Sequence, residues 1–428
     1  MDLYNYIFKN QSHNKVAIIY QGKKVTYGKL IKKISEQSER ISKLEENIFF
    51  ILESNPLNTL VYLFAVLKSK KKVVLINPLL AEKIDISELG YSKSILIKEE
   101  KLIPIKMNSQ NENNFENINL LTSGSTGTPK ICPIPDSVIR NKVKIVSNDF
   151  FEDYQEINEI LIFPVCSVTA LMIQIFPTLL RNGTVLIVEN LNTIPNLIEK
   201  YKINFIGLTP TLFELLYRKN KKIFNTVDNI FLGGEPISFN ATKQVAQSLR
   251  NSSVIVGYGL TEAAGAVSYG NIIDLPNNSV GKIMTGTRVR VKKLNNNQMH
   301  GEIQVNNVIQ NIWIDTGDIG YIEKDYLFVI DRKKNIVIVS GKKIYPNLVR
   351  DKVMEIQNID DVLVYGINSE TTGEAIAIDI ITDVDYITLT KYLKQKLTLQ
   401  EFPKKINYVT SLNILKSLKK EIKNETIK

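Results

Sequence analysis

The sequence predicts an α/β protein with a large N-terminal part and a small C-terminal α+β part. Three observations indicate this. Short, nearly continuous apolar runs recur over the first 280 residues, helix-like segments separate them, and the pattern changes near residue 280 to strands joined by turns. Strands buried on both faces and separated by helices are typical of parallel sheets. A chain of 428 residues is also long enough for two or three domains.

The apolar runs of the N-terminal part alternate with segments of helical periodicity. Predicted strands are 15–20, 46–52, 72–76, 159–163, 183–188, 205–208, 229–234 and 252–259. Predicted helices are 211–219, 241–249 and 58–70, the last with its apolar residues on one side.

Residues 160–180 carry no charge and are long enough to suggest a membrane span. Pro164 and Pro177 interrupt this stretch. We therefore expect a buried strand, a turn and a buried helix, and no membrane partner.

Beyond residue 280 the predicted strands are joined by turns, and fewer helical segments separate them. This pattern is typical of antiparallel sheet. Predicted elements here are strands at 288–294, 301–307, 326–344, 360–367 and 374–382, and a helix at 389–397. The charged run 331–335 is the predicted boundary, which gives domains 1–332 and 333–428.

The net charge of +10 comes from dispersed Lys and Arg residues and not from one basic face. This favours a small anionic ligand over nucleic acid. The two cysteines fit no metal-binding spacing and indicate a reducing, cytoplasmic location. With two histidines, a Ser–His–Asp hydrolase or a His-ligated metal enzyme is disfavoured.

The segment 120–130, LLTSGSTGTPK, has the composition of a phosphate-binding loop. Gly124 and Gly127 allow close backbone approach to an anion, and Lys130 adds a positive charge. The hydroxyls that can donate to phosphate oxygens are those of Thr122, Ser123, Ser125, Thr126 and Thr128. The spacing differs from that of the common P-loop, and a flexible surface loop is the alternative.

Two further segments contain residues suited to a nucleotide. In GYGLTEAAG, the ring of Tyr258 can lie against a flat base, and the Glu262 carboxylate beside Thr261 can bind Mg²⁺. Asp318 and Arg332 can both bind ribose hydroxyls. Each signal is weak alone, because a Thr-Glu pair is often only a helix start and an Asp often caps a turn.

In this order, the segments 121–130, 233–238, 258–262 and 315–346 resemble the adenylate-forming superfamily. Its members include acyl-CoA synthetases, aryl-acid ligases, luciferases and adenylation domains of nonribosomal peptide synthetases. The resemblance covers nearly the whole chain. It implies stacked, mostly parallel sheets with helices, a small β-barrel-like part and a small mobile C-terminal domain. It also implies an ATP-dependent carboxylic acid ligase that releases pyrophosphate.

The resemblance assigns roles to the matching positions. The loop would hold the β- and γ-phosphates, Thr261 would contact the α-phosphate and Glu262 would bind Mg²⁺. Tyr258, next to Gly259, would stack on adenine. The remaining assignments are Gly234 and Glu235 for the other side of the base, Asp318 and Arg332 for the ribose, and Lys334 for the domain hinge.

The family's catalytic lysine lies near the C-terminus in a Pro-x-x-x-x-Gly-Lys context. Aligning residues 411–428 with that pattern gives Lys419. Asn413 and Leu418 stand where the family has Pro and Gly. Lys416 or Lys420 as the operative residue, and an inert basic tail, stay open.

The resemblance also bears on the acid and the thiol acceptor. Residues 163–172 contain neither the Asp of amino-acid-activating relatives nor a His at Ser167, so we expect an aryl or short to medium acyl acid. Gly341-Lys342 in place of Gly-Gly favours a carrier protein over CoA. The alternatives are amino-acid activation and a non-catalytic nucleotide-binding protein. Candidate residues of the acid pocket are Cys166, Ser167, Val168, Gly233, Gly257 and Ala264.

Overall fold

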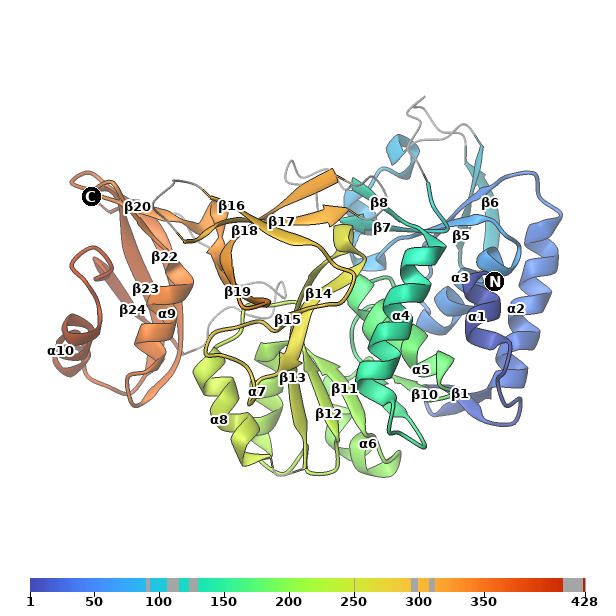
Figure 1. Cartoon of the computed structure of the whole chain (residues 1–428), viewed down its shortest axis with the longest axis horizontal. Coiled ribbons are helices and arrows are strands. Elements are labelled where there is room, and N and C mark those ends of the chain that lie inside the picture. Colours follow the sequence, from blue (N-terminus) through green and yellow to red (C-terminus); the bar gives the residue numbers. More distant parts are fainter. Residues whose placement is uncertain are drawn as a thin grey trace.

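The computed structural model describes residues 1–89, 93–105, 115–122, 130–249, 251–293, 299–307, 312–410 and 426–427. In this part of the chain the strands form three sheets, two in the large N-terminal part and one in the small C-terminal part (Figure 1). The predicted α/β class with a small α+β C-terminal unit is confirmed.

The first sheet has a parallel centre and an antiparallel strand at each edge. Its order is β6 (Lys101–Ile105), β5 (Ser94–Lys98), β3 (Ile48–Ile51), β4 (Lys72–Leu75), β7 (Ile118–Thr122) and β8 (Lys130–Ile134). The edge hairpin of β7 and β8 flanks the predicted phosphate loop.

The second sheet has 13 strands and changes from parallel to antiparallel at β13. The parallel part, closed by antiparallel β2, is β13 (Ser253–Leu260), β12 (Asn229–Leu232), β11 (Phe205–Leu208), β9 (Asn158–Leu161), β10 (Thr184–Ile187), β1 (Val16–Tyr20) and β2 (Lys23–Thr26). The antiparallel part is β14 (Gly265–Asn271), β15 (Lys282–Ile283), β19 (Tyr326–Arg332), β18 (Ile312–Glu323), β17 (Gly301–Asn307) and β16 (Val289–Lys293). The resemblance implied a small β-barrel-like part. In the described residues, these antiparallel strands instead continue the large sheet and do not close into a barrel.

The third sheet forms the C-terminal unit. Its strands are β20 (Val337–Val339), β21 (Lys342–Ile344), β22 (Ile359–Ser369), β23 (Gly373–Thr382), β24 (Lys405–Tyr408) and β25 (Thr426–Ile427). β19 belongs to the second sheet and β20 to the third. The division of the chain at residues 332 and 333 stays a prediction.

Helices cover the sheets, and several begin at a residue whose side chain accepts a hydrogen bond from the first turn. The α-helices are α1 (Leu3–Phe8), α2 (Tyr27–Ser42), α3 (Pro56–Lys68), α4 (Asp136–Phe151), α5 (Phe176–Leu180), α6 (Ile194–Lys200), α7 (Pro210–Lys219), α8 (Phe239–Ser248), α9 (Pro346–Met354) and α10 (Tyr386–Lys396). Short 3₁₀ segments are η1 (Pro78–Lys83), η2 (Ile86–Leu89), η4 (Leu191–Thr193), η5 (Thr261–Ala263) and η6 (Lys333–Asn335).

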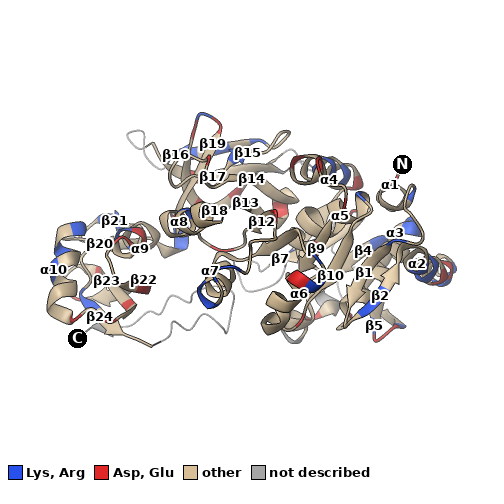
Figure 2. Cartoon of the chain, turned by 90° about the horizontal axis from the view of Figure 1, so that it is seen from below, with Lys and Arg blue, Asp and Glu red and all other residues tan. Residues whose placement is uncertain are grey.

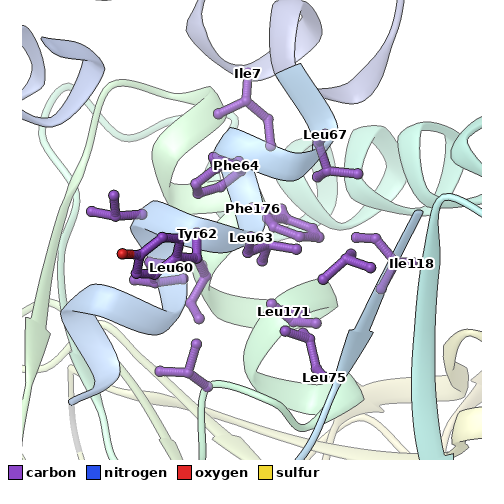
Figure 3. Close-up of a cluster of buried hydrophobic side chains, with 14 of the residues drawn as sticks. Ile7, Leu60, Tyr62, Leu63, Phe64, Leu67, Leu75, Ile118, Leu171 and Phe176 are labelled. Atoms are coloured by element: carbon purple, nitrogen blue, oxygen red, sulfur yellow. The ribbon is translucent and has the colours of Figure 1, made fainter. Parts of the chain in front are cut away.

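Helix α3 lies in the main core, which contains residues of both N-terminal sheets. Its side chains meet α1 at Ile7 and α5 at Phe176 (Figure 3). Every residue from Thr59 to Leu67 is buried. The expectation of a single apolar side on this helix was therefore wrong, because neighbouring elements cover it on all sides.

The charge-free stretch 160–180 folds as predicted into a buried strand, a turn and a helix. β9 ends at Leu161, and a π-helical segment, η3 (Ala170–Ile175), continues into α5. Among the helices that the structure describes, none is long and apolar enough to cross a membrane.

Basic and acidic residues are interspersed on the exposed helices. Helices α2 and α4 both carry Lys or Arg together with Asp or Glu (Figure 2). This distribution is the one expected from the dispersed charge of the sequence.

Candidate functional site

The ends of the predicted phosphate loop are fixed by the β7–β8 hairpin. Thr122 and Lys130 pair across the two strands, and the Thr122 hydroxyl donates to the Lys130 carbonyl at 3.5 Å. Ser123, Gly124, Ser125, Thr126 and Gly127 lie outside the described residues, as does Thr128. The hairpin therefore defines where the loop begins and ends.

The Thr-Glu motif forms the turn between β13 and β14. Thr261 and Glu262 lie in η5, and the chain then reverses through Ala264 and Gly265, which have φ of 56° and 98°. Gly259 lies close to this reversal, since a Cβ there would be 2.5 Å from the Gly265 carbonyl oxygen. The turn is therefore compact and presents Thr261 and Glu262 together.

Cys132 connects this turn to β8, the strand that follows the predicted phosphate loop. Its thiol, on β8, donates to the Thr261 carbonyl at 3.3 Å. Burial, and then the nearby Glu262 carboxylate, raise the pKa of Cys132 to about 12, so this thiol stays protonated. Cys132 and Thr261, which are 129 residues apart in the chain, thus lie side by side.

Asp318 brings together the predicted base and ribose residues. One carboxylate oxygen accepts a hydrogen bond from the Tyr258 hydroxyl at 2.6 Å, and the other pairs with Arg332 Nε at 2.6 Å. The Asp318 side chain is 6% exposed and that of Arg332 is 51% exposed. Burial, and then the Asp318 charge, raise the pKa of Tyr258.

Strand register explains this arrangement. Asp318 on β18 lies opposite Arg332 on β19, which brings residues 14 apart into contact. Gly317 has a positive φ of 73°, and the Thr316 hydroxyl accepts from the Asp318 amide at 3.1 Å. Sequence reasoning identified all three residues of the cluster but missed the bond between Tyr258 and Asp318.

Gly234 and Glu235 lie just beyond the carboxyl end of β12. Gly234 has a φ of 85° with no atom within 4 Å of a Cβ position. Glu235 accepts a hydrogen bond from the Thr211 amide at 3.3 Å, in the first turn of α7. Gly234 therefore leaves open space where a flat base could approach.

The pocket candidates fall into two groups. Cys166, Val168 and Ala264 belong to the same apolar cluster, and burial raises the pKa of Cys166 to about 12. Ser167 has a structural role, because its hydroxyl accepts a hydrogen bond from the Ala170 amide at 3.1 Å, at the start of the helix. The second group is Gly233 and Gly257.

Phe231 fills the space beside these two glycines. A Cβ on Gly233 would be 3.0 Å from the Phe231 ring, and a Cβ on Gly257 would be 2.8 Å from it. The ring is 4% exposed and packs in one cluster with Ala266, which follows Gly265. Sequence reasoning missed Phe231, although its place two residues before Gly233 on a strand puts both on the same face.

The Glu262 carboxylate alone is better suited to a Mg²⁺ ion that is also bound by a nucleotide than to a metal ion bound by protein side chains only. The described residues contain no cluster of three or more His, Cys, Asp or Glu that could hold a metal ion. Mg²⁺ is commonly bound by one or two carboxylates together with phosphate oxygens and waters. The half-buried Glu262, which lies near Cys132 on the strand that follows the predicted phosphate loop, fits this donor set.

The two remaining predicted residues concern the C-terminal unit. Lys334 is exposed in η6, between the last strand of the second sheet and the first of the third. Lys419, with the alternatives Lys416 and Lys420, lies outside the described residues.

The comparisons with known proteins agree on one family. Residues 97–310, half of the chain, match the AMP-binding enzyme family. The chain is 26% identical over 423 residues to 2-succinylbenzoate–CoA ligase of Lactococcus lactis, covering 90% of this chain and 92% of that protein. It is 28% identical over 298 residues to long-chain-fatty-acid–CoA ligase of Escherichia coli O157:H7, covering 61% of this chain and 53% of that protein.

The fold is similar to that of o-succinylbenzoate CoA synthetase of Bacillus subtilis, solved in complex with an acyl-adenylate intermediate. The TM-score is 0.76 at 19% identity, covering 96% of this chain and 95% of that one. The four motifs, the fold and the family match are mutually consistent. The chain belongs to the AMP-binding enzyme family, within the adenylate-forming superfamily.

Proposed function

We propose that the protein is an ATP-dependent carboxylic acid ligase that forms an acyl-adenylate, releases pyrophosphate and then transfers the acyl group to a thiol. The observation that carries this proposal is the course of β13. One end of this strand presents Tyr258 to Asp318, and the turn that follows places Thr261 and Glu262 against β8. Residues suited to the base and the ribose thus lie next to the Thr261–Glu262 turn, which contacts β8 directly after the predicted phosphate loop.

The first half-reaction makes the acid reactive. A carboxylate oxygen attacks the α-phosphorus of ATP, the bond between the α-phosphorus and the bridging oxygen breaks, and pyrophosphate leaves. Negative charge concentrates on the phosphates, so donors fixed in position provide most of the stabilisation. No side-chain nucleophile or general base is needed.

Each residue has a proposed part in this step. Lys130 and the loop that it ends would bind the departing phosphates, and Thr261 would contact the α-phosphate. Asp318 would bind the ribose, with Arg332 beside it. Glu262 would bind Mg²⁺, which neutralises phosphate charge. Lys419 would lie between the carboxylate and the α-phosphate.

In the second half-reaction a thiol sulfur attacks the acyl carbonyl and AMP leaves, with the thiol proton released to solvent. We propose a phosphopantetheine thiol as the acceptor. The names of the relatives support CoA, whereas Gly341–Lys342 favours a carrier protein. Gly341 forms a turn between β20 and β21 with a φ of 79° and no atom within 4 Å of a Cβ position.

For the acid, we propose an aryl or short to medium acyl compound without a free amine. Residues 163–172 provide no carboxylate to pair with an ammonium, and an unpaired charge in an apolar pocket is costly. Phe231 also limits the space beside Gly233 and Gly257.

The test is acid-dependent exchange of radiolabelled pyrophosphate into ATP, measured across a panel of aryl, acyl and amino acids. We expect exchange with at least one acid that has no amine. Lys419→Ala should reduce the rate by orders of magnitude, while Lys416→Ala and Lys420→Ala should not. No exchange with any acid, with ATP still bound, would leave a non-catalytic nucleotide-binding protein.

A further inference from the structure

Arg350, on α9 of the C-terminal unit, bonds to both parts of the molecule. Its Nη1 donates to the Ser238 hydroxyl, and its Nη2 pairs with the Asp361 carboxylate at 3.3 Å. Ser238 belongs to the N-terminal part, directly before α8, whereas Asp361 lies on β22 of the C-terminal unit. The Arg350 side chain is 16% exposed. It therefore bridges the two parts at a place largely removed from solvent.

Ser238 occupies the N-cap position of α8 but does not cap this helix. A serine there normally accepts a hydrogen bond from a backbone amide of the first turn. The hydroxyls of Thr26 and Thr209 do so for α2 and α7, whereas the Ser238 side chain forms no such bond to α8. Ser238 is 5% exposed, and its hydroxyl accepts from Arg350 instead. The hydroxyl thus serves the contact between the two parts and not its own helix.

A second contact joins the same two regions. Arg218, in the last turn of α7, donates to the Asp360 carbonyl at 2.8 Å, at the start of β22. Both contacts lie on elements that hold residues 233–238, the segment predicted to bind the base. The segment ends at the serine, and the Thr211 amide of α7 donates to Glu235 within it. The C-terminal unit therefore docks against the surroundings of this base segment.

The bonds of Arg350 suit a contact that forms and breaks. A hydrogen bond from a charged donor is stronger than one between neutral groups, so the bond to Ser238 favours the docked arrangement. The Nε of Arg350 is buried and has no hydrogen-bond partner among the described residues, which is unfavourable. On separation, Arg350 keeps Asp361, because both belong to the C-terminal unit, and water can satisfy the remaining nitrogens. Docking and separation therefore each satisfy part of the guanidinium.

We propose that Arg350 and Ser238 form a latch, which holds the C-terminal unit against the base segment in this arrangement and opens when the unit turns. Arg350 is a positioning residue, and its pair with Asp361 orients the guanidinium toward Ser238. The consequence for catalysis rests on the proposed function. If the two half-reactions use different arrangements of the unit, a weaker latch changes the ratio of their rates.

The test is the distance between the two parts, measured on the full chain by double electron–electron resonance. Spin labels are attached at Gln247→Cys on α8 and Gln395→Cys on α10, which are exposed positions. Cys132→Ser and Cys166→Ser in every sample restrict labelling to these two sites. Each variant is then compared with this labelled reference protein.

Ser238→Ala removes the acceptor and leaves the pair of Arg350 and Asp361 in place. We expect it to raise the ratio of separated to docked protein about tenfold, which corresponds to the loss of a hydrogen bond to a charged group. Ser238→Thr keeps a hydroxyl and should retain the reference distances. Arg350→Met should act as Ser238→Ala does, and adding Ser238→Ala to it should change nothing further.

Lys352→Met is the matched control. It removes a cation two residues along α9 whose partner, Glu401, belongs to the C-terminal unit, and it should retain the reference distances. Reference distances in Ser238→Ala would overturn the latch, and so would an equal shift in Lys352→Met. A shift by Ser238→Ala that is just as large in the Arg350→Met background would also overturn it. Should Arg350→Met fail to fold, Ser238→Ala and Ser238→Thr decide the question.

Pyrophosphate exchange and thioester formation, measured on the unlabelled variants, test the catalytic consequence. We expect Ser238→Ala to change the ratio of the two rates severalfold, because only one half-reaction uses the docked arrangement. An equal change in both rates would contradict a role of the latch in catalysis. A wild-type protein without either activity would contradict the proposed function, while the distance measurement would still decide whether the latch exists.

Discussion

Asp318 is the residue at which the predicted base and ribose residues of the nucleotide site meet. Its two carboxylate oxygens are bonded to Tyr258 and to Arg332, each at 2.6 Å. A ribose that binds Asp318 would share these oxygens with, or displace, one of those partners. The side chain is thus held in a fixed orientation before any ligand arrives.

Asp318→Asn should raise the KM for ATP in pyrophosphate exchange about tenfold or more. An amide loses the charge that pairs with Arg332, and a hydrogen bond to a charged group contributes roughly 1.5–3 kcal/mol. Tyr258→Phe removes only the hydroxyl and should have a smaller effect. An unchanged KM in a variant with a wild-type thermal melt would contradict the proposed ribose role.

Glu159 is a buried acid that the proposed chemistry does not use. It is 0% exposed on β9, and one carboxyl oxygen accepts from the Thr178 hydroxyl at 2.9 Å. The other has no hydrogen-bond partner among the described residues. Burial raises the pKa of Glu159 from 4.5 to about 8.

The folded state therefore holds the Glu159 proton more tightly than the unfolded state does. This contribution to stability is complete below about pH 4.5 and is lost as the pH rises to about 8. Relative to Glu159→Gln, the wild-type protein should lose on the order of 1 kcal/mol of unfolding free energy per pH unit over that range. Urea unfolding of both proteins at about pH 5 and about pH 8 measures the difference, and a constant difference would show that Glu159 is not titrating there.

At the scale of elements, the neighbouring strands β12 and β13 form one wall of the proposed acid pocket. Gly257 lies within β13 and Gly233 directly follows β12, and Phe231 occupies the space that side chains at these two positions would take. The Phe231 side chain therefore determines how much space is left beside these two glycines. Phe231 belongs to an aromatic group that includes Phe150 and Phe205.

Phe231→Leu should shift the preference in exchange toward larger acids. The smaller side chain leaves room beside Gly233 and Gly257, at a stability cost of roughly 1–2 kcal/mol. The measurement is the ratio of kcat/KM for a longer and a shorter acid. Phe205→Leu is the matched control, because Phe205 packs in the same cluster on β11, and an equal shift in both variants would count against a specific role for Phe231.

At the scale of the whole molecule, polar contacts join the C-terminal unit to the large N-terminal part. Lys333 pairs with Glu302 at 2.8 Å, and Arg218 donates to the Asp360 carbonyl at 2.8 Å. His300 contacts the Tyr345 hydroxyl at 3.0 Å. In the first of these pairs Lys333 is exposed and Glu302 is buried. The turning of the C-terminal unit that we propose would require these contacts to break and form again.

Lys334→Pro should retain pyrophosphate exchange and reduce thioester formation tenfold or more. Proline fixes φ near −65° at the point where the chain passes from the second sheet to the third. Lys334→Ala keeps the backbone free and should retain both half-reactions. Equal loss of both activities in Lys334→Pro would argue for misfolding, and loss of neither would argue against a hinge here.

The fold and the order of the motifs could be predicted because they follow local rules. Apolar runs and helical periods predicted the strands and helices, and glycines and hydroxyls marked the phosphate loop. The resemblance then located Thr261, Glu262 and Asp318. What local rules could not show was that the antiparallel strands extend the large sheet, or that α3 is covered on all sides.

By itself, the sequence determined the class of the fold, the family and the kinds of residue offered to a nucleotide. Tertiary structure alone decided which of these residues meet. The bond from Tyr258 to Asp318 spans 60 residues, the contact of Cys132 with Thr261 spans 129, and the bond from Lys142 to Ala266 spans 124. Such contacts depend on strand pairing and packing between distant segments, because register fixes which side chains face each other across a sheet.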